Sequence, residues 1–191
     1  MTTLKHEIAV TRFNEKTWNE NIEWRKHYGW KGCAYCSRVP IKASVPFKTP
    51  IFVLEMNNDH NKIEGIGLIF NIEKLSKNEY INFKKFGTKN IKEWYEKNKK
   101  DKRARQFQIY NEKAMGYNNY IYNSMFRIDS TDFSIKEKRI IYVLEHLVFK
   151  GSGHLKRGQG ITIIPEWIKK NNVIHFVNEF KNMFKSRFNA L

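Results

Sequence analysis

The stretch of the chain best equipped for chemistry is residues 150–160, which read KGSGHLKRGQG. It holds four of the ten glycines and no acidic residue. Glycines allow successive backbone amides to converge on one anion, and an arginine can bind a phosphate through two nitrogens. We therefore expect this loop to contact phosphate or sugar groups through Lys150, His154, Lys156, Arg157 and Gln159.

The order of elements around this loop excludes a nucleotide triphosphatase of the Walker type. A Walker loop follows a strand, opens a helix and ends in Gly-Lys-Ser or Gly-Lys-Thr. Residues 150–160 instead follow a predicted helix, precede a predicted strand and end in Gly-Gln-Gly. The alternative is an ordinary solvent-exposed loop whose glycines form a helix cap and a tight turn.

Aromatic residues gather near the start of the chain and alternate with cations. Such rings can stack on nucleic-acid bases while neighbouring cations hold phosphates, or they can hold a methylated base or a cap-like cation. We expect either Trp24 or Trp30 to be exposed and to stack a base, with the rest in the core. The cluster comprises Trp18, Trp24, Tyr28, Trp30 and Tyr35.

Metal and redox chemistry find little support in the sequence. Cys33 and Cys36 form a CxxC, but no second pair completes a zinc site. A thioredoxin-like CxxC would open a helix, whereas Pro40 follows here. We expect two ordinary thiols, and neither a metal nor another cofactor.

Carboxylates are also poorly placed for catalysis. Glu55 and Glu64 flank a predicted hairpin and could face one another across it, but pairing with lysine explains them more simply. Hydrolytic nucleases gather several acids around metal ions, and no such group is visible. We therefore expect a protein that is not an enzyme.

Composition favours a polyanionic partner. The formal net charge is +16 and the pI about 9.8, and charge of this size usually accompanies nucleic acid or, as a second candidate, an anionic membrane surface. A lysine-rich and asparagine-rich proteome would produce the same bias. No signal peptide is visible, and no apolar run reaches the roughly 18 residues of a membrane span. We expect an intracellular protein without membrane contact.

The elements that must position these residues follow from local patterns. Residues 51–56 and 62–70 predict a hairpin around the turn 57–61, and residues 90–100 and 172–188 predict helices. A further strand is expected within residues 117–128. The basic run 97–105 is most simply a solvated helix end.

A capping box at Ser134 and Glu137 predicts the start of another helix, and Gly151 falls where a left-handed cap would end it. Gly65 and Gly67 share one face of the second hairpin strand. We favour a barrel corner as their role, with close approach by another group as the alternative. The mixture of elements, without repeated βαβ units, predicts an α+β fold.

The hairpin resembles the core of PUA-like domains, the group that includes the EVE, ASCH and YTH families. The resemblance rests on Leu54-Glu55-Met56, the turn, and residues 64–69 (EGIGLI). It implies a small, partly closed β-barrel with flanking helices that binds RNA or a modified base. Trp24 and Trp30 are then the candidate walls of an aromatic pocket.

The wider pattern is similar to uncharacterised proteins of nucleocytoplasmic large DNA viruses, on residues 52–58 with 63–69 and 149–151 with 154–158. We expect a single domain over residues 1–191, with a barrel core at about 33–165 and helix 172–188 packed on it. The predicted function is non-enzymatic binding of RNA or DNA. The alternative is a structural or genome-packaging protein of a virion that contacts other viral proteins.

Overall fold

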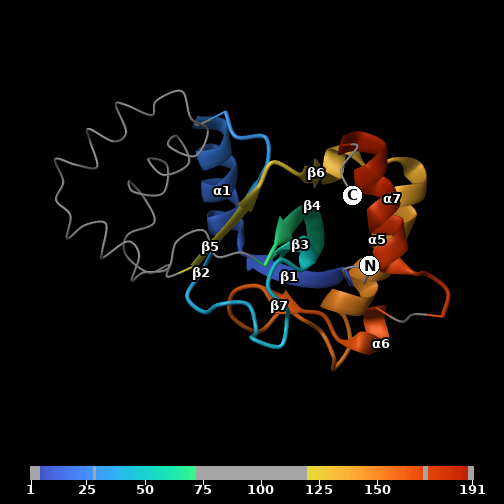
Figure 1. Cartoon of the computed structure of the whole chain (residues 1–191). Helices are drawn as coiled ribbons and strands as arrows, with labels where there is room; N and C mark the ends of the chain where they lie inside the picture. Colours follow the sequence, from blue (N-terminus) through green and yellow to red (C-terminus); the bar gives the residue numbers. More distant parts are fainter. Residues whose placement is uncertain (1–4, 28, 72–119, 170–171, 189–191) are drawn as a thin grey trace, which may run out of the picture.

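The computed structural model describes residues 5–27, 29–71, 120–169 and 172–188 (Figure 1). Its main sheet is mixed and five-stranded. The strand order across it is β6 (Arg127–Asp129), β4 (Lys62–Phe70), β3 (Pro50–Asn57), β1 (Glu7–Phe13) and β7 (Thr162–Ile163). Strands β1 and β3 run parallel, and the other pairs are antiparallel.

Layers cover both faces of this sheet (Figure 1). On one side lie α1 (Glu15–His27) and a two-stranded sheet of β2 (Cys33–Ser37) and β5 (Tyr120–Ser124). On the other side lie α5 (Ile135–Phe149) and α7 (Phe176–Phe188). The short 3-10 helix Ser130–Asp132 precedes α5, and α6 (Glu166–Lys169) follows β7. The predicted α+β class is confirmed.

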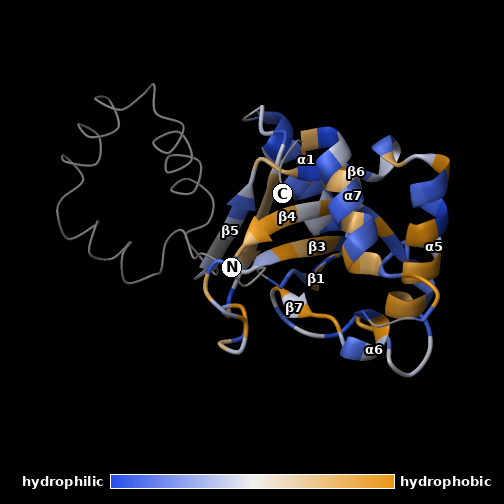
Figure 2. Cartoon of the chain, turned by 45° about the vertical axis from the view of Figure 1, so that its right-hand side comes forward, coloured by the Kyte–Doolittle hydropathy of each residue, from blue (hydrophilic) through white to orange (hydrophobic). Residues whose placement is uncertain are grey.

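Strand β3 is buried along its whole length because it lies between these two layers. Phe52 and Leu54 join the core beneath α5 and α7, whereas Ile51 and Val53 join the smaller core beneath the two-stranded sheet. Alternate residues of a strand point to opposite faces, so burial on both sides requires an uninterrupted apolar run. Figure 2 shows this hydrophobic band along β3 and β4.

Local signals in the sequence proved accurate. The predicted hairpin is β3 and β4, with a bulge between Leu54 and Met56. At the start of α5, the Ser134 hydroxyl accepts from the Glu137 amide at 3.3 Å, and Glu137 accepts from the Ser134 amide at 2.7 Å. Gly151 follows the helix with φ +75°, as its predicted capping position requires.

The last helix packs against the main core through a stripe of aromatic residues. Phe176, Phe180 and Phe184 are fully buried, and Val177 and Phe188 pack partly buried against the same core. The helix predicted over residues 172–188 begins later than expected, and Val173 is 89 % exposed. It precedes the helix, which begins at Phe176, so helical spacing does not place it on the buried face.

Two further expectations need correction. The segment predicted as one strand within 117–128 forms β5 and β6, which belong to different sheets joined through Met125 and Phe126. A barrel is not confirmed, because the described part of the main sheet is open and ends in the short strands β6 and β7.

The predicted helix 90–100 and the basic run 97–105 lie outside the described residues. The single-domain prediction is not tested.

Candidate nucleic-acid interface

The glycine-rich loop is fastened to the sheet by an arginine that the sequence did not single out. From β1, Arg12 donates through Nε to the Leu155 carbonyl at 2.5 Å and through Nη1 to Thr162 Oγ1 at 3.1 Å. Asn58, in the turn between β3 and β4, donates to the Lys156 carbonyl at 3.0 Å. The loop therefore has a defined position over the end of β1.

Close contacts explain two of the loop's glycines. Gly158 has φ +125°, and a Cβ there would lie 3.2 Å from Cζ of Arg12. Gly160 has φ +63°, and a Cβ there would clash with the Ser37 hydroxyl. Since L side chains rarely adopt such positive φ values, these glycines let the backbone lie against the Arg12 guanidinium and the end of β2.

Arg12 carries a charge that no carboxylate in the described residues balances. It is half-buried, and burial alone lowers its pKa, although a guanidinium stays protonated at neutral pH. Three other cations have carboxylate partners: Arg127 with Glu55, Lys169 with Glu7 and Arg187 with Glu137.

Arg25 is the closest comparison, because it is half-buried and forms no ion pair with a described residue. Burial, and then the charge of Arg127, lower the pKa of Arg25 overall. The negative charges of Glu55 and Asp129 partly oppose this shift. For Arg12, burial is the only cause of the shift, and no described carboxylate raises its pKa. Its environment is therefore the more favourable for an external anion.

Backbone amides of the loop are also available. Within the described part of the chain, the amides of residues 157–160 donate no hydrogen bond. The amide of Leu155 bonds to the Val148 carbonyl at 2.7 Å, and that of Lys156 points to Nδ1 of His154 at 3.4 Å. Unsatisfied amides beside cationic side chains are a typical setting for an anion.

The structure leaves the side chains predicted to bind phosphate largely accessible. Lys150, Arg157 and Gln159 are exposed, and His154 and Lys156 are half-buried. Nζ of Lys150 lies 2.9 Å from Nε2 of His146. All five residues belong to the loop that Arg12 contacts at Leu155 and Gly158.

Trp30 lies away from this loop, and Trp24 belongs to α1. Both are half-buried, so the expectation that one of them is exposed was wrong. The Trp30 indole donates to the Cys33 carbonyl at 3.2 Å, at the start of β2, whereas Gly160 contacts Ser37 at its end. Four residues of strand separate these points by about 13 Å. A base-stacking role for Trp24 or Trp30 stays a prediction.

A different tryptophan lies beside the loop. Trp167 of α6 is 54 % exposed, and its Cζ2 atom is 3.5 Å from where a Cβ of Gly153 would lie. Sequence reasoning missed both Trp167 and Arg12. Arg12 carried no usable signal, since its contacts cross more than a hundred residues of chain, whereas Pro165 did mark the start of the helix that presents Trp167.

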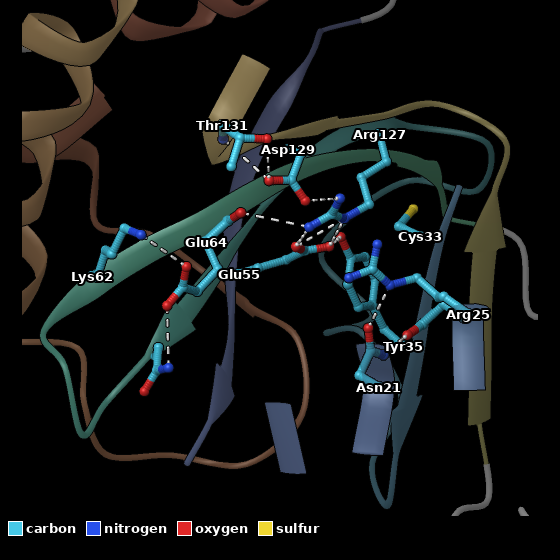
Figure 3. A network of polar contacts seen from close by, with 12 residues as sticks. Asn21, Arg25, Cys33, Tyr35, Glu55, Lys62, Glu64, Arg127, Asp129 and Thr131 are labelled. Atoms are coloured by element: carbon cyan, nitrogen blue, oxygen red, sulfur yellow. Dashed lines mark hydrogen bonds and ion pairs between the residues drawn. The ribbon is translucent and has the colours of Figure 1, made fainter. Parts of the chain in front are cut away.

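A second polar group is buried between the two sheets (Figure 3). Arg127 binds the Glu55 carboxylate through Nε at 3.0 Å and Nη2 at 2.7 Å, and Asp129 through Nη1 at 2.8 Å. Tyr35 donates to Glu55 at 2.8 Å. Burial would lower the pKa of Arg127, but Glu55 and then Asp129 raise it above its usual value. Three donor atoms from two residues, Nε and Nη2 of Arg127 and the hydroxyl of Tyr35, therefore hold the Glu55 carboxylate.

This cluster also decides the role of the paired glycines. A Cβ on Gly65 would lie 2.6 Å from both Arg127 Nη2 and Glu55 Oε2, and one on Gly67 would clash with the Tyr35 hydroxyl. Close approach by other groups, rather than a barrel corner, therefore explains them. Glu64 does not face Glu55; it pairs with Lys62 at 3.2 Å.

The CxxC lies in a strand and not at a helix start. Cys33 is buried and Cys36 is exposed, since residues three apart in a strand point to opposite faces. Burial raises the pKa of Cys33 to about 12, so its thiol is protonated at neutral pH. Across the described ranges, no three His, Cys, Asp or Glu side chains gather as a metal site would require.

Comparisons with known proteins add no relationship: no family model, curated protein or solved structure matches the chain. Among the helices in the described ranges, none combines the length and apolar character needed to cross a membrane.

Proposed function

We propose that this protein binds nucleic acid, without catalysis, through a phosphate-contacting surface that we call the loop site. It comprises Arg12 and residues 150–160. The observation that carries the proposal is the environment of Arg12, a half-buried guanidinium with no carboxylate partner in the described residues. Buried charges are normally paired, and a phosphate would supply the missing negative charge.

The surroundings of Arg12 support a phosphate in particular. Gly158 lies against the Arg12 guanidinium, the amides of residues 157–160 donate no hydrogen bond within the described residues, and Lys156 and Arg157 add two further cations. The chain as a whole carries a net charge of +16, which attracts a polyanion over distances of about a Debye length. A single small anion would not account for this excess of charge, whereas a nucleic-acid backbone would.

The PUA-like resemblance adds RNA or a modified base as the predicted ligand. The hairpin of β3 and β4 supports it. Comparing the affinities for RNA and DNA oligonucleotides decides between these two ligands.

Binding of fluorescently labelled RNA and DNA oligonucleotides to the purified full chain tests the proposal. The Lys156→Ala/Arg157→Ala variant should bind at least about tenfold more weakly, because each lost phosphate contact weakens binding. Thermal unfolding should match the wild type, since neither side chain is buried.

A matched control removes the same charges elsewhere. Lys138 and Arg139 are exposed residues of α5, and Lys138 lies about 18 Å along the helix from Lys150. The Lys138→Ala/Arg139→Ala variant should retain most of the affinity. Equal affinities of the two double variants would contradict the loop site and leave only non-specific attraction.

A further inference from the structure

We infer that the loop site takes single-stranded nucleic acid, with one unpaired base stacked on the indole of Trp167. This inference rests on the proposed function and names its substrate class. It begins from an exposed aromatic side chain: Trp167 is 54 % exposed, whereas Trp18 is 7 % exposed and anchored in the core.

The residues around Trp167 anchor its backbone. The next residue, Ile168, is fully buried, and its amide donates to the Pro165 carbonyl at 3.1 Å. Lys169 is also buried and bonds both Glu7 and Glu166 at 2.5 Å. With its backbone anchored in this way, the segment that carries Trp167 needs little further ordering when a base stacks on the ring.

The indole ring of Trp167 lies against the loop site. Its Cζ2 atom is 3.5 Å from the position of a Cβ on Gly153, and Gly153 itself is exposed. His154 directly follows this glycine in the chain, and Lys150 lies three residues before it. A base stacked on the open face of the indole would therefore have its own backbone phosphates beside the cations of the loop.

Nearby carboxylates do not oppose this arrangement. Glu166, the residue before the tryptophan, pairs with Lys169 at 2.5 Å. Glu7 pairs with both Lys169 and Lys5. Because each acid has a lysine partner, its repulsion of a phosphate is reduced.

We infer a single strand rather than a duplex because only an unpaired base exposes its face to a protein side chain. In a duplex, each base face is covered by its neighbours in the stack, so it is not available to a side chain without unstacking. An unpaired base offers its face freely, and stacking on an aromatic ring is tolerant of sequence. The combination of one exposed indole and a cationic loop is typical of single-strand binding.

Three probes of equal length test the inference on the full chain: labelled oligothymidylate, a blunt duplex, and an oligomer of abasic sugar-phosphate. The wild type should bind oligothymidylate most tightly. Trp167→Ala should weaken that binding by about 5- to 150-fold, the range measured for stacked bases. The same change should leave binding to the abasic oligomer unaltered, while Trp167→Phe should retain most of the affinity.

The outcomes separate this inference from the proposed function. If Lys156→Ala/Arg157→Ala weakens binding but Trp167→Ala changes none of the three probes, the stacking inference is overturned and the phosphate site stands. Tighter binding of the duplex than of oligothymidylate overturns the inference in the same way. Absence of binding to every probe overturns both. Thermal unfolding of Trp167→Phe and Trp167→Ala shows whether each variant is folded.

Discussion

Arg127 of β6 reaches across the intervening strand β4 to bind Glu55 of β3, and the two side chains pass over Gly65. The pair is almost completely buried, with 3 % and 1 % of the two side chains exposed. Its contacts with Tyr35 also join the main sheet to the two-stranded sheet. The pair thus fixes the frame that carries β1 and, through Arg12, the loop site.

Removal of the Glu55 carboxylate should destabilise the protein strongly. Glu55→Ala leaves the Arg127 guanidinium buried with Asp129 as its only carboxylate partner among the described residues, and breaking a buried pair in this way costs about 3–5 kcal/mol. Urea denaturation measures the change in the free energy of unfolding. The control is Lys136→Ala, which breaks an exposed pair with Glu179 and should cost no more than about 1 kcal/mol. Similar losses for the two variants would contradict the role of the buried pair.

An added methyl group at Gly67 should also destabilise the protein. In Gly67→Ala the new Cβ would meet the Tyr35 hydroxyl and the Cys33 sulfur, and overpacking of this kind costs about 1–3 kcal/mol. Gly153→Ala is the matched control, because its nearest neighbour would be Trp167 at 3.5 Å and its φ is not positive. Thermal unfolding compares the two variants. A destabilised Gly153→Ala beside an unaffected Gly67→Ala would be the opposite of the expected result.

Stability in acid should depend on Glu137. Two hydrogen bonds from Arg187, at 2.8 and 2.7 Å, hold the pKa of Glu137 below its usual 4.5, against the opposing effect of burial. A depressed pKa in the folded state stabilises it above about pH 4.5, and this stabilisation is lost as the pH falls through the folded-state pKa. The difference in unfolding free energy between wild type and Arg187→Ala should therefore shrink below about pH 4.5. Urea denaturation at several pH values measures it; a difference that grows toward low pH would refute the assignment.

Arg12 should contribute to binding through its charge. Arg12→Ala should weaken binding similarly for all sequences and reduce the slope of log affinity against log salt by about one. Arg12→Lys keeps the charge and should restore the slope, although it loses the paired contacts to Leu155 and Thr162. Binding isotherms at several salt concentrations measure both effects. An unchanged slope in Arg12→Ala would show that Arg12 does not contact phosphate.

The features predicted correctly from the sequence are local ones. The capping box of Ser134 and Glu137 and the hairpin of β3 and β4 depend on residues close together in the chain. Arg12 and Leu155, in contrast, are 143 residues apart, and Glu55 and Arg127 are 72 apart. No local pattern specifies such contacts, because they arise only when the strands assemble.

The roles of individual glycines and tryptophans show the same division. Gly151 could be identified as a helix cap from its position after an apolar stripe. Gly65 required knowledge of the side chains that cross above it. The exposed tryptophan at position 167 could not be told from a buried one, since composition does not reveal which face of a short helix is covered.

The most direct test of the loop site is the salt dependence of oligonucleotide binding by wild type, Lys156→Ala/Arg157→Ala and the control Lys138→Ala/Arg139→Ala. Loss of two phosphate contacts should reduce the slope of log affinity against log salt by about 1.4 on a single strand and about 1.8 on a duplex. We expect that reduction in the loop variant and a slope near the wild-type value in the control. Equal slopes for all three proteins would contradict the proposal that this loop binds nucleic-acid phosphates.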